Sequence, residues 1–301
     1  MRLLSFGEIL WDIIDGVEHL GGAPFNFAAH SARCGHESFI LSRVGKDSRG
    51  IKAFNKCKEY GVNNSLIQFD QEHPTGTVEV VLDKGQPDYT IFENVAFDFI
   101  TLDNLMNLDR DMFEVFYFGS LCQRNVTSAL TLKSILKNFR FANIFYDVNL
   151  RKGGYNKEIV QQSVGACTIL KLNIDEVPTI ARLLFDTDKD LDSFCRHIQD
   201  RFPAITNIVI TAADKGCYVY ADNQIEYVQG RKVDVKDAVG AGDAFSAAFM
   251  HSLYRTRDAV SAAETANYLG GFVASQAGPI PEYTTEIKDR LGVSPRVSSN
   301  N

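Results

Sequence analysis

The chain has 301 residues, a formal net charge of −7 and 45% hydrophobic content, so it can bury a large core and has no excess of positive charge for nucleic acid. Its longest apolar runs are too short to span a bilayer, and acids interrupt the first segment before an export signal develops. We therefore expect a cytoplasmic protein without membrane or nucleic-acid partners. Its six cysteines form no CxxC pair and its six histidines no HExxH motif, which favours reduced, buried thiols over a zinc site.

Strand-like and helix-like segments alternate along most of the chain. The strand-like runs lie at 3–9, 39–44, 115–120, 143–148, 168–173 and 207–211. The amphipathic helical runs between them lie near 25–35, 48–60, 126–139 and 174–184. This alternation predicts an α/β fold in three layers, with a mostly parallel sheet flanked by helices on both faces.

Two segments, about 12–20 and 75–98, break the alternation. They contain short strand-like runs with turns and no helices, which predicts a small antiparallel sheet inserted into the core. Such a sheet could serve as a lid over a cleft or as a dimer contact. A hairpin at 217–229 and a final pair of helices ending near 275 follow. We expect one domain over 1–290 and a polar, disordered tail at 291–301.

The stretch "VKDAVGAGDAFSAAFM" at 235–250 places Gly240, Ala241 and Gly242 directly before Asp243 and an apolar helical run. Glycines permit tight turns, and the first turn of a helix presents free N–H groups that attract an anion such as phosphate. Asp243 then has two interpretations. It caps the helix, as Asp often does, or it is a base that faces a phosphate held by the surrounding N–H groups.

Two standard nucleotide-binding loops can be excluded by spacing. A P-loop needs GxxxxGK followed by Ser or Thr, whereas Gly45-Lys46 is followed by Asp47. A GxGxxG dinucleotide fingerprint does not occur anywhere in the chain.

The segment "DAVGAGDAF" resembles the signature of the ribokinase-like sugar kinases, the PfkB family, in which a DTxGAGD motif opens a helix. Further motifs follow the family's order: "GGAPFNFAAHSARCG" at 21–35, "RVGKDSRG" at 43–50, "DVNLR" at 147–151 and "NIDE" at 173–176. The resemblance covers residues 5–282. "GEILWD" followed by "GGAPFNFA" is most similar to the fructokinase branch.

Two positions depart from the family pattern. Ala238 replaces the usual Thr of the DTxGAGD motif, where family members vary. "TAADKG" at 211–216 has Ala213 where the family's TxGxxG strand end has Gly, which would crowd the edge of the nucleotide.

The resemblance implies a catalytic set for phosphoryl transfer, a reaction that needs alignment and charge neutralisation more than covalent help. Asp243 would accept the proton of the sugar's primary hydroxyl. The turn Gly240-Ala241-Gly242 and the N–H groups of Ala241, Gly242 and Asp243 would form the anion hole. Arg151 would meet phosphate oxygens or sugar hydroxyls, although it could also be a solvated loop residue.

The family reading also assigns the nucleotide and its Mg²⁺. Asn173 and Glu176 would organise Mg²⁺ through water, although an Asx turn and a solvated first-turn acid are the ordinary alternatives. Lys171 is either an exposed charge or a phosphate ligand. The residues assigned to ATP are Lys171, Asn173, Glu176, Thr211, Gly216, Gly242 and Asn267.

Sugar recognition is assigned to Asp12, Gly22 and Asn26, because a carboxylate and an amide suit adjacent hydroxyls and glycine lets the backbone approach the ring. Phe97, at the end of the second lid segment, is a candidate for covering the sugar. A monovalent cation site, K⁺, is implied beside the anion hole. Its ligands would be Asp237, Val239, Ala274 and Gly278.

These assignments lead to an ATP-dependent fructokinase as the main hypothesis, with a possible homodimer formed through the lid. A kinase of another small sugar or sugar acid, such as ribose or 2-keto-3-deoxygluconate, is the alternative within the class. A catalytically silent member that binds sugar or nucleotide is the alternative from another class. It would be marked by a lost base or a broken anion hole, and both are intact in the sequence.

Overall fold

The computed structural model describes residues 1–293 except 15, 84–85, 104 and 106–107. Most of the predicted tail, 294–301, lies outside the described residues. Leu291, which the tail was expected to include, is instead the last residue of helix α9 (Thr285–Leu291) and is buried.

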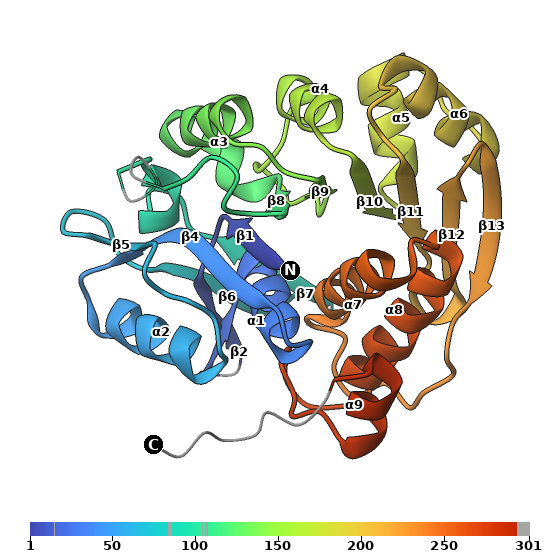
Figure 1. The fold of residues 1–301 in the computed structure, drawn as a ribbon. Helices are drawn as coiled ribbons and strands as arrows, with labels where there is room; N and C mark the ends of the chain where they lie inside the picture. The colour runs from blue at the N-terminus through green and yellow to red at the C-terminus, as the bar shows by residue number, and fades with distance from the viewer. Residues whose placement is uncertain (15, 84–85, 104, 106–107, 294–301) are drawn as a thin grey trace.

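A large sheet runs through the molecule in the order β13-β12-β11-β10-β9-β8-β1-β4-β5 (Figure 1). The strands from β5 to β11 pair in parallel, and β12 and β13 add an antiparallel edge. Their bounds are β1 Arg2–Phe6, β4 Glu37–Gly45, β5 Ile67–Asp70, β8 Val115–Gly119, β9 Asn143–Asp147, β10 Ile169–Asn173, β11 Asn207–Thr211, β12 Gly216–Ala221 and β13 Gln224–Gln229. The chain leaves β1 toward β4 on one side and later returns to β8 on the other, which makes β1 the topological switch point where such sheets bind ligands.

Helices cover both faces of this sheet. On one face lie α3 (Val126–Asn138), α4 (Lys157–Ala166), α5 (Val177–Phe185) and α6 (Leu191–Arg201), and on the other lie α1 (Ala23–Arg33), α2 (Ser48–Glu59), α7 (Ala241–Thr256), α8 (Ala259–Ala274) and α9 (Figure 1). The structure therefore confirms the predicted α/β fold in three layers. Short 3₁₀ turns occur at Ala96–Phe99, Leu121–Arg124 and Ala213–Lys215.

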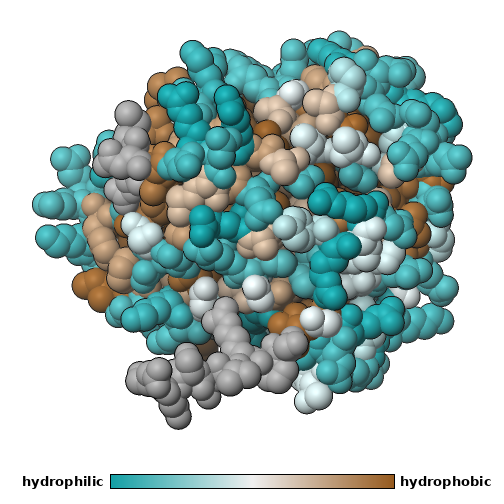
Figure 2. All heavy atoms as spheres, viewed as in Figure 1, coloured by the Kyte–Doolittle hydropathy of each residue, from teal (hydrophilic) through white to brown (hydrophobic). Residues whose placement is uncertain are grey.

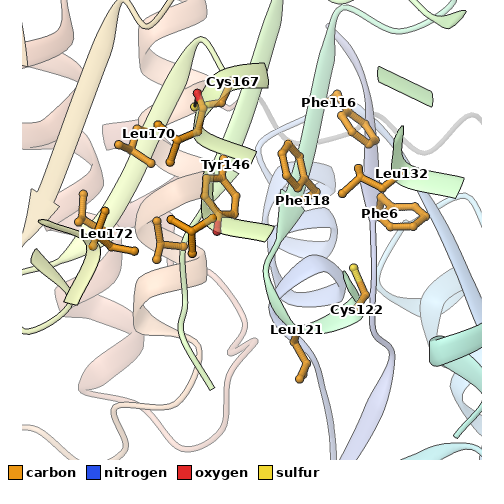
Figure 3. Close-up of a cluster of buried hydrophobic side chains, with 14 of the residues drawn as sticks. Phe6, Phe116, Phe118, Leu121, Cys122, Leu132, Tyr146, Cys167, Leu170 and Leu172 are labelled. Carbon is orange, nitrogen blue, oxygen red and sulfur yellow. Dashed lines mark hydrogen bonds between the residues drawn. The ribbon is translucent and has the colours of Figure 1, made fainter. Parts of the chain in front are cut away.

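Alternation along the strands divides the core between the two faces. Phe116 and Phe118 of β8 pack in one buried cluster, whereas Val115 and Tyr117 belong to the cluster on the opposite face. Figure 3 shows the first cluster, in which Phe116 and Phe118 of β8 lie near Phe6 of β1, and Tyr146 of β9 lies near Leu170 and Leu172 of β10. Strands buried on both faces account for the nearly continuous apolar runs in the sequence.

A second, smaller sheet confirms the predicted insertion. It has the order β3-β2-β6-β7, with bounds β2 Leu10–Ile14, β3 Val17–Gly21, β6 Gly76–Asp83 and β7 Gln86–Ile91. The outer pairs β2-β3 and β6-β7 are antiparallel hairpins, and the central pair β2-β6 is parallel. The sheet therefore joins two hairpins that lie far apart in the sequence.

Three helices were not anticipated from the sequence: α4, α6 and α9. Each begins with a recognisable cap, because the side chains of Asn156, Asp190 and Thr284 accept hydrogen bonds from first-turn N–H groups. On the face drawn in Figure 2 hydrophilic residues predominate. Within the described residues, no helix combines the length and apolar character that crossing a membrane requires.

Candidate active site

A cavity of about 600 Å³ lies at the carboxyl ends of the central strands, beside the smaller sheet and the start of α7. Its lining comes from segments spread over most of the chain. The lining residues are Glu8, Leu10, Asp12, Gly22, Ala23, Asn26, Val78, Ile91, Leu121, Asn149, Arg151, Lys171, Asn173, Thr211, Asp237, Ala238, Val239, Gly240, Gly242 and Asp243. The structure thus brings most of the residues singled out in the sequence to one place.

The start of α7 forms one wall of the cavity. Gly240 precedes the helix with φ +77°, and a Cβ atom there would lie 2.6 Å from Cβ of Pro279, so this position needs glycine. The N–H of Ala241 points to the carbonyl of Ala238 at 3.3 Å, and Ala241 does not line the cavity. The N–H groups available for an anion at this end are therefore those of Gly242 and Asp243.

Asp243 is half-buried at the third position of α7, and its carboxylate accepts a 2.8 Å hydrogen bond from the side-chain amide of Asn26. No side chain caps α7 in this part of the described chain, so Asp243 is not the helix cap that was its alternative interpretation. Burial and then the negative charge of Asp147 raise the pKa of Asp243 to about 6, against the opposing effects of Asn26, Lys171 and Arg151. A carboxyl group with this pKa can accept a proton near neutral pH.

Glu8 is a site residue that the sequence reasoning missed. It follows β1 directly after Gly7, it is only 4% exposed, and its Oε2 atom has no hydrogen-bond partner within the described structure. Burial, opposed by backbone N–H groups, raises its pKa to about 7. An acid one residue after a strand-ending glycine, at the switch point of the sheet, was the available signal.

The predicted sugar residues lie on neighbouring elements. Asp12 is on β2, and burial, opposed by the charge of Arg151, raises its pKa to about 6. Gly22 has φ +108°, and a Cβ atom there would lie 2.4 Å from the backbone oxygen of Glu8, so the turn before α1 needs glycine. Asn26 is 3% exposed, and its Oδ1 atom has no partner among the described residues.

Phe97 is not brought to the cavity, contrary to the expectation. Its side chain is fully buried, with the guanidinium of Arg124 5.0 Å from its ring centre. It packs so tightly against Gly76 that a Cβ atom there would lie 2.6 Å from the ring. The apolar side chains that line the cavity are those of Leu10, Val78, Ile91 and Leu121.

Asn173 and Glu176 are joined by reciprocal hydrogen bonds. The Glu176 carboxylate accepts from the backbone N–H groups of Asn173 (2.8 Å) and Leu150 (2.6 Å), and the Asn173 side chain accepts from the Glu176 N–H (2.9 Å). Of these two residues, Asn173 lines the cavity and Glu176 does not. Glu176 therefore acts on the cavity through Asn173 and the loop that carries Arg151, rather than by direct contact.

Lys171 lines the cavity, and its ammonium group is paired with the buried Asp147 at 2.9 Å. Burial lowers the pKa of Lys171, but the charges of Asp147 and Glu176 outweigh it and the net shift is upward. Lys171 is thus a buried cation held in place by Asp147. It is not the exposed charge that was one of its two interpretations from the sequence. Arg151 also lines the cavity, although its guanidinium is exposed and bonded only to the adjacent carbonyl of Leu150 among the described residues.

The predicted nucleotide residues are divided by the structure. Thr211, at the end of β11, lines the cavity, but Gly216 and Asn267 do not. Gly216 has φ +112° where β12 begins, and Asn267 donates to the carbonyls of Val228 and Gln229, which fixes α8 to β13. Gly216 and Asn267 therefore shape the local fold and do not contact the cavity.

The segments expected to hold K⁺ are adjacent. The Asp237 carboxylate accepts from the N–H groups of Val239 (3.0 Å) and Gly278 (3.2 Å). The carbonyl of Ala274 accepts from the N–H groups of Lys236 and Asp237, which occupies its lone pairs. In the part of the chain that is described, no cluster of three or more His, Cys, Asp or Glu residues could hold a metal ion.

Known carbohydrate kinases resemble this chain over most of its length. The family model described as pfkB family carbohydrate kinase matches residues 4–286. Fructokinase-2 of Zea mays is 25% identical over 314 residues, which cover 94% of this chain and 91% of that protein. Among solved structures, fructokinase with bound ATP from Xylella fastidiosa has a TM-score of 0.85 at 20% identity and covers 97% of both chains. A double mutant of Vibrio cholerae O395 fructokinase, with fructose, ADP and potassium ion bound, has a TM-score of 0.81 at 24% identity and covers 93% of this chain and 94% of that one.

The α/β fold and the family match together define a carbohydrate kinase, an enzyme that transfers phosphate to a sugar. The chain belongs to the pfkB family of carbohydrate kinases.

Proposed function

We propose that this carbohydrate kinase transfers the γ-phosphoryl group of ATP to the primary 6-hydroxyl of D-fructose, which yields fructose 6-phosphate and ADP. The observation that carries the proposal is the placement of Asp243. It is a half-buried carboxylate whose pKa is raised to about 6, and it lies between Asn26 and the glycine turn at the start of α7. The fructokinases among the relatives and structural neighbours, together with "GEILWD" and "GGAPFNFA", favour fructose.

In the proposed reaction the proton of the attacking hydroxyl passes to Asp243 as the oxygen bonds to phosphorus, and the bond to the ADP oxygen breaks. The N–H groups of Gly242 and Asp243 bind the oxygens of the transferred group, and Lys171 supplies a fixed positive charge beside them. Asp12 and Asn26 orient the sugar by its hydroxyls.

Mg²⁺ neutralises phosphate charge when it is bound with ATP. Asn173 would face the waters of the ion, which suits a cation that keeps most of its hydration shell, and Glu176 would hold Asn173 in place. For K⁺, the turn that links Asp237 to Gly278 is the proposed position. The carbonyl of Val239 is a better candidate ligand than that of Ala274, because the latter already accepts two N–H groups.

A kinase for ribose or a sugar acid is the alternative within the class. Purified protein should be assayed for ADP release with ATP and Mg²⁺ over a panel of sugars. We expect the highest kcat/KM for fructose. A tenfold advantage of ribose or 2-keto-3-deoxygluconate would overturn the assignment of fructose and leave the carbohydrate kinase class intact.

The same assay with Asp243→Asn tests the base, because Asn keeps the size of the side chain but cannot take the proton. We expect kcat to fall about 10²- to 10⁴-fold, the usual range for general acid–base catalysis, with ATP and sugar still bound. A folded, substrate-binding variant that keeps most of the wild-type kcat would show that Asp243 is not the base. A wild type that binds sugar but releases no ADP with any substrate would favour the silent regulator.

Light scattering in solution tests the dimer proposed to form through the lid.

A further inference from the structure

A group of buried polar contacts lies beneath the start of α7, at the edge of the cavity. Its centre is Asp147, the last residue of β9, which is 1% exposed. Its carboxylate accepts hydrogen bonds from Lys171 Nζ (2.9 and 3.1 Å) and from the Tyr117 hydroxyl (3.1 Å). Ser246 Oγ, on α7, lies 3.0 Å from Asp147 Oδ2. A buried carboxylate that accepts this many hydrogen bonds is fixed in position.

Two of these partners connect Asp147 to the anion-binding turn. Lys171 Nζ lies close to Gly242, since a Cβ atom on Gly242 would be 3.4 Å from it. Ser246 Oγ is also 3.0 Å from the carbonyl of Gly242. Asp147 itself does not line the cavity.

We propose that Asp147 is a positioning residue for phosphoryl transfer, which holds the Lys171 ammonium group and the first turn of α7 in register without touching either substrate. The inference rests on the proposed function, because it assigns Asp147 to the site where Lys171, Gly242 and Asp243 act on the phosphate. Among the described residues, Asp147 accepts both of the hydrogen bonds that Lys171 Nζ donates, so it fixes this long, flexible side chain at the edge of the cavity.

The arrangement also makes Asp147 part of the electrostatic environment of the base. The titratable and charged groups that face Asp243 are Glu8, Tyr117, Asp147, Arg151 and Lys171. After burial, the negative charge of Asp147 is the largest influence that raises the pKa of Asp243, and Lys171 opposes it. Removal of the Asp147 charge should therefore lower the pKa of Asp243.

The test uses Asp147→Asn, which keeps the shape of the side chain and removes its charge. We expect the acid limb of the pH profile of kcat/KM for the sugar to move to lower pH, and the KM for ATP to rise about tenfold or more because Lys171 is no longer fixed. The KM for the sugar should stay within about threefold, since the sugar residues are untouched. A role limited to stability would not move the acid limb.

Tyr117→Phe is the matched control, because it removes one hydrogen bond to the same carboxylate and keeps the charge. Its acid limb should stay at the wild-type pH. A second variant, Asp147→Asn with Lys171→Met, removes both charges and so does not leave an unpaired buried ammonium if the single variant fails to fold. Compared with Lys171→Met alone, the pair should lose little further kcat/KM for ATP, because Asp147 acts on ATP through Lys171.

An unmoved acid limb in a folded, active Asp147→Asn enzyme would overturn the proposal, as would independent effects of the two substitutions. A ¹³C NMR titration of the Asp243 carboxyl in the free protein gives the same pKa comparison without any substrate. If wild type shows no kinase activity toward any sugar, the proposed function fails, and the role of Asp147 fails with it. An active wild type with an unchanged Asp243 pKa in the variant overturns the role of Asp147 alone.

Discussion

The Glu8 side chain is buried, and its Oε2 atom has no hydrogen-bond partner within the described residues. Because burial raises its pKa from 4.5 to about 7, the folded protein holds this proton more tightly than the unfolded chain does. Its contribution to stability is therefore present below pH 4.5 and is lost as the pH rises through about 7. Above pH 7 the ionised Glu8 lowers the stability of the fold. Such a loss is typical of functional sites, where a strained or destabilised group is kept for activity.

We expect Glu8→Gln to be more stable than wild type at pH 8 and to lose this advantage at pH 5. The linkage amounts to about 2–3 kcal/mol between these pH values, from about 1.4 kcal/mol for each unit of pKa shift. Thermal unfolding of the substrate-free protein at both pH values measures it. Glu264→Gln, at an exposed position of α8, is the control for loss of the same charge without burial. Equal differences at pH 8 and pH 5 would contradict the prediction.

A single glycine, Gly240, sets the backbone turn at which helix α7 begins. Gly240 has a positive φ and also lies against Pro279, so an added Cβ atom meets both backbone strain and a clash. Gly153 has nearly the same φ, +76°, but a Cβ atom there has open space. Alanine at either position therefore adds backbone strain, but only alanine at Gly240 also displaces the turn before α7.

We expect Gly240→Ala to lower kcat at least about tenfold, because the clash must move the N–H groups that we propose bind the phosphate. Gly153→Ala should cost only the strain of a left-handed alanine, about 1–2 kcal/mol of stability, and leave kcat near wild type. Steady-state kinetics and thermal unfolding of both variants check this. Similar kcat values for the two variants would show that the turn tolerates displacement.

The sequence predicted the elements whose signals are local. The glycine turn before α7, the strands of the parallel sheet and the smaller sheet were all recognised, because hydrophobic period and turn residues mark them directly. The caps Asn156, Asp190 and Thr284 were equally local signals, and reading them would have found α4, α6 and α9. Motif order likewise led to Asp12, Asn26, Asn173 and Asp243 as lining residues of one cavity.

What the sequence could not predict depends on contacts between distant segments. Asp147 was read only as part of "DVNLR", because its role arises from Tyr117, Lys171 and Ser246, which lie on three other elements. Phe97 was misplaced for the same reason, since only the packing of Gly76 and Arg124 around it shows that it is buried. Periodicity gives the face of an element on which a side chain lies and not what covers that face.

At the scale of the whole molecule, the six cysteines are free, buried and spread over all three apolar clusters. Burial raises the pKa values of the thiols, of Cys34 and Cys217 to about 12, so the native thiols are poor nucleophiles. Labelling of a thiol therefore requires its surroundings to open.

The proposed single domain over 1–290 predicts that these openings occur together. Under native conditions with a slow thiol reagent, intact-protein mass spectrometry should find molecules with either no label or six, and few in between. Denatured protein labelled at all six positions is the reference. An abundant species labelled only at some cysteines, such as Cys57 in the cluster of α1 and α2, would show that the chain opens as more than one unit.

The hydrogen bond between Asn26 and Asp243 joins side chains that are 217 positions apart in the chain. During synthesis, at about 5–20 residues per second, roughly 10–45 s separate the addition of these two residues. Through that interval the nascent chain already carries Asp12, Gly22 and Asn26 but has neither the proposed anion-binding turn nor the proposed base. On the proposed mechanism, a chain that ends before Asp243 cannot transfer phosphate from ATP to the sugar, and catalysis begins only after this part of the chain has been translated and folded.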